Sequence, residues 1–318
     1  MIEEHVTNDL FEEQLEKVSC SIQDPNQGLF GQNSMMWRLA RHALIGAHGS
    51  GRALLLQISH PWVTLGIDEH SSTRNDPLGR AVRTFTAVVS IVYGSKDQAM
   101  RQARIVRAAH DKVNGIITKN LGAFEKGSSY SANEANAMLW VHATLWDTSV
   151  TIHELFYGPL SAIEKASFYE ETKLFAYMFG IPESIVPNTW DDFMEYNKEM
   201  WDSDYLLVND DTLDLARFVF TPLHPILSPA MVWLKQITSA TLPERFRDEF
   251  GFSIPNPRIL NVGTSVIKNI EYFLPKAIKY GPSYVEATRR IEGKSSTFTT
   301  RMLTKNLFGK SELVSLEK

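Results

Sequence analysis

The chain of 318 residues contains a single cysteine, Cys20. One cysteine excludes a disulfide framework within the chain, and it excludes an all-cysteine metal cluster or zinc site. It also excludes the Cys-x-x-Cys-His motif through which haem is attached covalently. Because Cys20 lies in a polar stretch without helical spacing, we do not expect it to act as a thiolate ligand.

Long apolar runs are missing as well. No run approaches the ~20 residues that a membrane-spanning helix needs. The N-terminus, Met-Ile-Glu-Glu-His, is acidic and lacks the basic and then apolar regions of a signal peptide. From these two observations we expect a cytoplasmic protein.

Basic residues are outnumbered by acidic ones, and the whole chain has a net charge of -5. This balance argues against nucleic acid as a partner. The C-terminal segment differs, because residues 276–318 carry nine Lys and Arg against four Asp and Glu. We expect a basic, solvated tail over 281–318, with peripheral contact to an anionic membrane as the alternative role for this tail.

The spacing of apolar residues divides residues 1–280 into two parts. Residues 1–30 are polar and predict a flexible or loosely docked arm. Residues 31–280 show repeated helical spacing, and period-two strand patterns are few and short. The sequence therefore predicts an all-α protein with a single, bundle-like helical domain.

Helix boundaries follow from this spacing and from Pro and Gly. A glycine break is expected at 49–51, and a polar loop is expected at 68–76, with Asp76 capping the helix that begins at Pro77. The helices are predicted over residues 33–43, 53–60, 77–93, 96–117, 133–156, 161–179 and 263–280.

Three polar residues share one face of the helix that begins at Pro77. Arg80, Arg83 and Thr84 fall at i, i+3 and i+4, and the valines and Phe85 of this helix predict that it is largely buried. Arginines on a buried helix need carboxylates or an anionic ligand, because unpaired buried charge is costly. This need is met either by salt bridges to Asp68, Glu69 or Asp76, or by the binding of an anionic ligand.

Two histidines lie on apolar helix faces. His110 shares a stripe with Ala103, Val106, Val113 and Ile117. His142 precedes His153 by eleven residues, about three helical turns, so the two share a face if the helix is unbroken. From spacing alone, each is either a hydrogen-bonded core residue or a metal ligand.

Motifs of several enzyme classes are missing. Gly46-Ala-His-Gly-Ser-Gly51 lacks the third glycine of a dinucleotide fingerprint and the Lys-Ser/Thr of a P-loop. In His153-Glu-Leu-Phe-Tyr157, a tyrosine stands where a zinc protease has its second histidine. Neither a Glu-x-x-His pair nor a Gly-x-Ser-x-Gly elbow occurs, so a di-iron centre and a serine hydrolase are unsupported.

A series of short motifs between residues 33 and 200 resembles a known family. The series comprises Gly51-Arg-Ala-Leu-Leu-Leu-Gln-Ile-Ser-His60-Pro61, Gly66-Ile-Asp-Glu-His70, Asp76-Pro-Leu-Gly-Arg80-Ala-Val-Arg83-Thr84, His110-Asp-Lys-Val-Asn-Gly115 and Leu139-Trp-Val-His142-Ala-Thr144. In this order it is similar to the bacterial and fungal family that contains latex-clearing rubber oxygenases and the MpaB-type oxygenase of mycophenolic acid biosynthesis.

The resemblance implies a helical bundle around one non-covalent haem b. It implies that His110 is the iron's protein ligand, with Arg80 and His142 also in the cofactor site. It places Arg83 and Thr84 as hydrogen-bond donors to dioxygen. Rubber oxygenases have a lysine where this chain has Arg83, and a guanidinium is a poor iron ligand because it stays protonated.

The distal iron position is therefore expected to be open, to hold water, or to be filled by a histidine such as His70. The catalytic glutamate of the rubber oxygenases has no clear match, although Asp68, Glu69 and His70 lie in the corresponding neighbourhood.

The implied function is a haem-dependent oxygenase that uses dioxygen on a small apolar substrate, isoprenoid or lipid-like. Two alternatives stay open. One is a haem protein without oxygenase turnover, such as a sensor, a carrier or a peroxidase-like scavenger. The other is a helical lipid-binding module without a cofactor.

Overall fold

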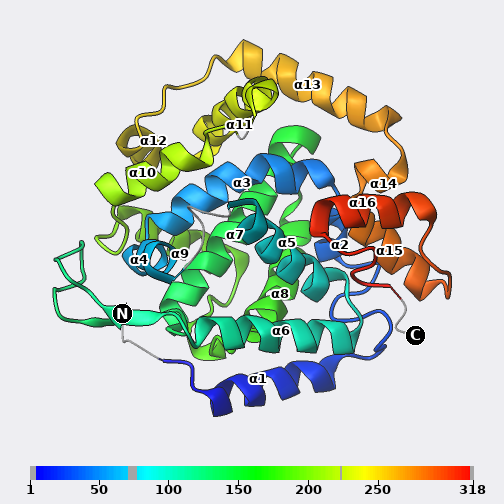
Figure 1. Ribbon diagram of the computed structural model, residues 1–318, viewed down its shortest axis with the longest axis horizontal. Coiled ribbons are helices and arrows are strands. Elements are labelled where there is room, and N and C mark those ends of the chain that lie inside the picture. The colour runs from blue at the N-terminus through cyan, green and yellow to red at the C-terminus, as the bar shows by residue number, and fades with distance from the viewer. Residues whose placement is uncertain (1–4, 71–76, 223, 316–318) are drawn as a thin grey trace.

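The computed structural model describes residues 5–70, 77–222 and 224–315, and helices make up most of them (Figure 1). The only sheet in these ranges has two short strands, so the all-α prediction is confirmed. No helix in them is long and apolar enough to cross a membrane. In chain order the elements are α1 (Asn8–Ser21), α2 (Met35–Ala40), α3 (Ala43–Ile58), α4 (Pro61–His70), α5 (Pro77–Tyr93), α6 (Lys96–His110), β1 (Asn114–Ile116), β2 (Ser129–Ser131), α7 (Ala135–Tyr157), α8 (Ala162–Tyr177), η2 (Glu183–Ile185), α9 (Trp190–Asp202), α10 (Asp210–Val219), η3 (Pro225–Leu227), α11 (Ser228–Thr241), α12 (Glu244–Glu249), α13 (Pro257–Phe273), α14 (Lys276–Lys279), α15 (Pro282–Ile291) and α16 (Phe298–Phe308).

The centre of the molecule is α7, which is buried along most of its length. Its closest neighbour is α3, and polar side chains as well as apolar ones join the two helices. Trp140 Nε1 donates to the Leu56 carbonyl at 2.9 Å, and Gln57 Nε2 donates to Thr144 Oγ1 at 3.0 Å. A helix buried on several sides must be apolar nearly all round, which explains why α7 lacks a single polar face.

The predicted glycine break at residues 49–51 is wrong, because α3 is continuous from Ala43 to Ile58. A Cβ on Gly49 would lie 2.7 Å from Thr148 of α7, and one on Gly51 would lie 2.2 Å from Thr238 of α11. These glycines therefore let two neighbouring helices approach the backbone of α3. The packing outweighs the helix propensity that each glycine costs, about 1 kcal/mol.

The N-terminal arm is not loosely docked. Residues 8–21 form α1, in which Thr7 caps the N-terminus by accepting a hydrogen bond from the Leu10 amide at 3.2 Å. Phe11, Leu15 and Val18 are buried in the main core, whereas Cys20 lies exposed on the same helix. The segment looked polar because only one narrow stripe of it faces the protein.

The basic C-terminal segment is not a solvated tail either. It forms α15 and α16, which pack against each other and against α5. Arg290 is buried, with its guanidinium bonded to the carbonyls of Tyr93 and Asn26 at 2.8 and 3.0 Å. Part of the positive charge that the sequence assigned to solvent therefore satisfies buried carbonyl groups.

The helix containing His110 is shorter than predicted. α6 ends at His110, and residues 114–116 form β1, which pairs antiparallel with β2. Val113 and Ile117 are therefore not on the stripe of α6. Further along the chain, the last predicted helix, 263–280, is divided into α13 and α14, because Pro275 interrupts it.

Residues Asp68 to His70 lie on the last turn of α4 and not in a loop, as the sequence had predicted. The predicted N-cap, Asp76, falls outside the described residues. Helices α5, α7 and α8 agree with their predicted boundaries to within two residues.

Candidate functional site

The candidate site residues lie on α4, α5, α6 and α7, and α5 and α6 are consecutive helices joined by a short turn. Ser95 begins α6 with a capping box to Gln98, so the chain reverses within two residues after α5. The two helices pack against each other. This reversal brings the N-terminal half of α5, which carries Arg80, to the same end of the pair as His110.

His110 is the last residue of α6 and is partly buried. Burial, together with the nearby charge of Arg107, lowers the pKa of its imidazole to about 4. Among the described residues, no hydrogen-bond partner is found for either ring nitrogen. The imidazole is therefore neutral at physiological pH and retains a lone pair, as a haem ligand requires.

The residues that follow His110 pack against α4 and β2. Val113 lies against Gly66 of α4, where a Cβ would approach it to 3.0 Å. Gly115 pairs with Tyr130 across the two strands, and a Cβ on Gly115 would lie 2.7 Å from the Tyr130 ring. Gly66 and Gly115, two of the glycines in the resembling motifs, are thus explained by close packing around this segment.

Tyr130 connects two of the predicted site residues. Its hydroxyl donates to Glu69 Oε2 at 2.5 Å and lies 3.0 Å from His70 Nε2. Since the hydroxyl hydrogen is given to Glu69, His70 must donate from Nε2. Burial and the neighbouring Glu69 raise the pKa of Tyr130, so the phenol stays protonated. Sequence reasoning found Glu69 and His70 but not Tyr130, which is sixty residues away.

The polar face of α5 is more exposed than predicted. Arg83 and Thr84 are exposed, Phe85 is 41% exposed, and burial is complete only toward Val92. Arg80 is half-buried, and burial together with the charge of Arg83 lowers its pKa. The prediction of a largely buried helix is therefore wrong for its first half, which carries two neighbouring cations and a partly exposed aromatic ring.

The remaining candidate carboxylate, Asp68, is exposed on α4 one residue before Glu69. His60, which precedes α4, is buried, and burial lowers its pKa to about 3. Its Nδ1 accepts a hydrogen bond from the Trp62 amide at 3.3 Å. This contact indicates a structural role for His60 at the start of α4.

His142 is buried in α7, and burial lowers its pKa to about 3. Trp146 Nε1 donates to His142 Nδ1 at 2.9 Å, so the imidazole hydrogen lies on Nε2. That Nε2 atom is buried without a hydrogen-bond partner in the described part of the chain. His142 therefore offers a donor, and not a lone pair, at Nε2.

His153, on the same helix, belongs to a different environment. It lies with His42, Tyr157 and Glu271 beside a pocket of about 430 Å³ between α2, α7 and α13. His42 Nδ1 lies 3.1 Å from Glu271 Oε1, and Tyr157 donates to the other carboxylate oxygen. The two histidines of α7 thus serve separate regions of the protein.

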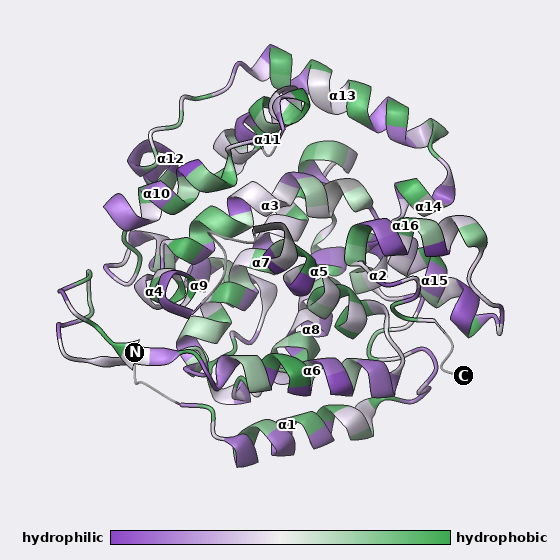
Figure 2. Ribbon diagram, viewed as in Figure 1, coloured by the Kyte–Doolittle hydropathy of each residue, from purple (hydrophilic) through white to green (hydrophobic). Residues whose placement is uncertain are grey.

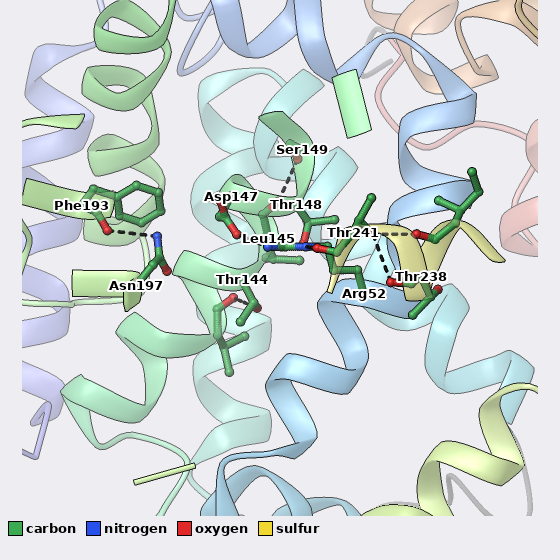
Figure 3. A network of polar contacts seen from close by, with 12 residues as sticks. Arg52, Thr144, Leu145, Asp147, Thr148, Ser149, Phe193, Asn197, Thr238 and Thr241 are labelled. Carbon is green, nitrogen blue, oxygen red and sulfur yellow. Dashed lines mark hydrogen bonds and ion pairs between the residues drawn. The ribbon is translucent and has the colours of Figure 1, made fainter. Parts of the chain in front are cut away.

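A buried ion pair stabilises α7 between these regions (Figure 3). Arg52 of α3 donates to Asp147 Oδ2 at 2.5 Å and to Thr148 Oγ1 at 2.7 Å, and its Nε donates to the Thr241 carbonyl at 2.8 Å. Because the partners are separated by about ninety residues, no local sequence pattern identified this contact.

Comparison with known proteins gives one family match. The model of the family described as ER-bound oxygenase mpaB/B′/rubber oxygenase, catalytic domain, matches residues 37–265. Two curated relatives are the uncharacterized proteins Mb2261 of Mycobacterium bovis and Rv2237 of Mycobacterium tuberculosis. Each is 26% identical over 153 residues, which are 47% of this chain and 57% of the relative, so the chain spans little more than half their length.

No solved structure matches the chain. The family match extends beyond the motifs that carry the resemblance and includes α9 to α12 and half of α13. It covers well over half of the sequence, and it confirms the family that the motifs indicated. The chain belongs to the family of mpaB and rubber oxygenase catalytic domains.

Proposed function

We propose that this protein is a haem b-dependent oxygenase that acts with dioxygen on an apolar, isoprenoid or lipid-like substrate. The observation that carries the proposal is the imidazole of His110. It is neutral, it has no hydrogen-bond partner among the described residues, and it is the last residue of α6, the helix that packs against α5. Membership in an oxygenase family supports the same conclusion.

The residues present fit the cofactor. The first half of α5 combines two cations with an exposed aromatic ring, and haem combines two carboxylates with an apolar macrocycle. Burial and the charge of Arg83 lower the pKa of Arg80, and a propionate near Arg80 would favour its charged form. In this proposal His110 is the iron ligand, Arg80 pairs with a propionate, and His142 would offer its unpartnered Nε2 hydrogen to the cofactor.

When bound, haem would supply the activation of dioxygen. The chain would supply hydrogen bonds from Arg83 and Thr84, which stabilise negative charge on oxygen. Glu69 accepts the Tyr130 hydrogen, and the Tyr130 oxygen accepts one from His70, so the three groups form a directed chain. Glu69 is the carboxylate in this chain that would accept a proton from the substrate, with Asp68 beside it.

The test is an optical spectrum of protein expressed with haem supply, in the ferric and ferrous states, with and without carbon monoxide. A Soret band that shifts on adding carbon monoxide to ferrous protein is expected. Dioxygen uptake is then measured with squalene and with squalane, its saturated analogue, as the matched control. Uptake with squalene alone, reduced by Glu69→Gln, supports cleavage of an isoprenoid double bond.

Two results separate the competing functions. Haem binding without dioxygen uptake for any unsaturated substrate would favour a sensor, carrier or peroxidase-like protein. Failure to bind haem, in a protein whose helical content is intact, would overturn the proposal.

A further inference from the structure

α13 carries an apolar stripe that faces away from the protein. The spacing of its members is three, four, four and three residues, which places them on one side of a helix. Each is at least half exposed. Their exposed fractions are 62% for Ile259, 64% for Val262, 50% for Val266, 55% for Ile270 and 83% for Phe273.

A different side of α13 attaches it to the molecule. Thr264 and Glu271 are buried, and α13 packs against α7. Gly263 lies against the ring of Trp233 in α11, so closely that a Cβ would lie 2.2 Å from it. The stripe therefore takes no part in holding α13 in place.

Further exposed apolar side chains lie on η3 and the start of α11, the helix that contacts Gly263, and on the segment that follows the stripe. They are Ile226 and Leu227 of η3, Val232 of α11, and Tyr272 and Ile278 near the end of α13 and in α14, with exposed fractions from 44% to 78%. Figure 2 shows hydrophobic residues recurring along α13 at the edge of the molecule. An exposed apolar surface that extends over several elements marks an interaction site.

The charges on this part of the chain have one sign at the surface. Between residues 254 and 281 the basic residues are Arg258, Lys268, Lys276 and Lys279, and the only acidic residue is Glu271. Glu271 is buried and bonded to His42 and Tyr157. An apolar stripe flanked by basic groups alone matches the interface of an anionic lipid bilayer.

We propose that α13 and the adjoining η3 and start of α11 dock this protein on the surface of an anionic membrane, with α13 lying in the interface. The basic flanks argue against a second copy of the chain as the occupant, because a twofold contact would bring like charges together. The sequence had suggested membrane contact through residues 281–318, but the two helices of that segment, α15 and α16, pack on the protein. The proposal does not depend on haem binding.

The test is flotation of the purified full chain with vesicles of phosphatidylcholine, with and without phosphatidylglycerol. The stripe variant is Val262→Asp with Val266→Asp. The matched control is Asn261→Asp with Ser265→Asp, which adds the same charge to exposed positions of the same helix outside the stripe. All four positions are at least intermediate in exposure, so the variants are expected to fold, and circular dichroism checks this.

We expect the natural chain to float with anionic vesicles and not with phosphatidylcholine alone. The stripe variant should lose binding by roughly tenfold or more, because two apolar side chains are replaced by charges. The control should retain most of its binding. Equal loss in both variants, or no binding of the natural chain to anionic vesicles, would overturn the proposal.

Light scattering during size-exclusion chromatography tests whether a second copy of the chain covers the stripe instead of a membrane. We expect the natural chain and both variants to share one oligomeric state in the absence of lipid. If the natural chain is a dimer that only the stripe variant dissociates, the stripe is a contact between copies and the membrane proposal is wrong.

Discussion

Trp146 donates its indole hydrogen to Nδ1 of His142 at 2.9 Å, and the two residues lie one turn apart on α7. Because an indole can only donate, this contact determines the tautomer of His142. The lone pair of the imidazole is occupied, and the remaining Nε2 carries hydrogen. Of the two histidines that the resemblance placed in the cofactor site, His110 alone therefore has a nitrogen ready to coordinate iron.

His110→Ala is expected to abolish stable haem binding and to leave a folded helical protein, because the side chain is only partly buried at a helix end. Haem occupancy is measured from the Soret absorbance after reconstitution. Added imidazole should partly restore the ligated spectrum in His110→Gly. An unchanged occupancy in the alanine variant would contradict the assignment.

Trp146→Phe is expected to lower the free energy of unfolding by about 1–3 kcal/mol, because His142 Nδ1 would be left buried without a donor. Nitrogen NMR of the imidazoles reports the tautomer directly. The natural chain should show hydrogen on Nε2 of His142, and the variant should lose this preference. Hydrogen on Nδ1 in the natural chain would show that the contact is absent.

Stability is expected to fall as the pH drops below about 6.5, because several histidines stay neutral in the folded state. Burial is the main cause that lowers the pKa of His60 and His142 to about 3 and that of His110 and His153 to about 4. Between pH 4 and 6.5 the unfolded chain binds more protons, so lowering the pH favours unfolding. Each histidine contributes up to about 1.4 kcal/mol per pH unit in this window.

Urea unfolding at a series of pH values between 4 and 7 checks this slope. The matched variant is His142→Gln, which removes one of these groups and should reduce the slope by about one proton. A pH dependence that does not change in this variant would mean that His142 titrates normally in the folded protein.

Asp147→Ala is expected to cost about 3–5 kcal/mol of stability, because Arg52 would keep a buried charge without its partner. The exposed pair of Glu13 and Lys17, 2.7 Å apart, provides the control. Glu13→Ala should cost less than about 1 kcal/mol, since solvent screens that pair. Similar losses in both variants, measured by thermal unfolding, would show that the Arg52 pair is not desolvated.

Two glycines of α3 are expected to respond in opposite directions to alanine. A Cβ on Gly51 would lie 2.2 Å from Thr238 and 3.2 Å from Phe220, so Gly51→Ala should destabilise the protein by about 1–3 kcal/mol. A Cβ on Gly46 would meet only Phe85, at 3.7 Å, so Gly46→Ala should stabilise the helix by about 0.5–1 kcal/mol. Chemical denaturation of both variants distinguishes these outcomes.

The local sequence determines the type and the boundaries of several helices in this protein. The apolar spacing and the terminating Gly94 place α5 between Pro77 and Tyr93, and the same spacing places α7 and α8. These elements follow from sequence because side chains three and four residues apart share a face whatever the rest of the chain does. The order of the motifs was also sufficient to indicate the family.

Contacts between distant residues were decided only by the tertiary structure. α3 continues through Gly49 and Gly51 because α7 and α11 need their small surface, and α6 ends at His110 because the residues beyond it pair with β2. Tyr130 joins Glu69 to His70 from a strand sixty residues away. A periodic pattern tells which face of an element is buried but not which element covers it, so the packed glycines, the buried Arg52 pair and the Tyr130 contact required the folded chain.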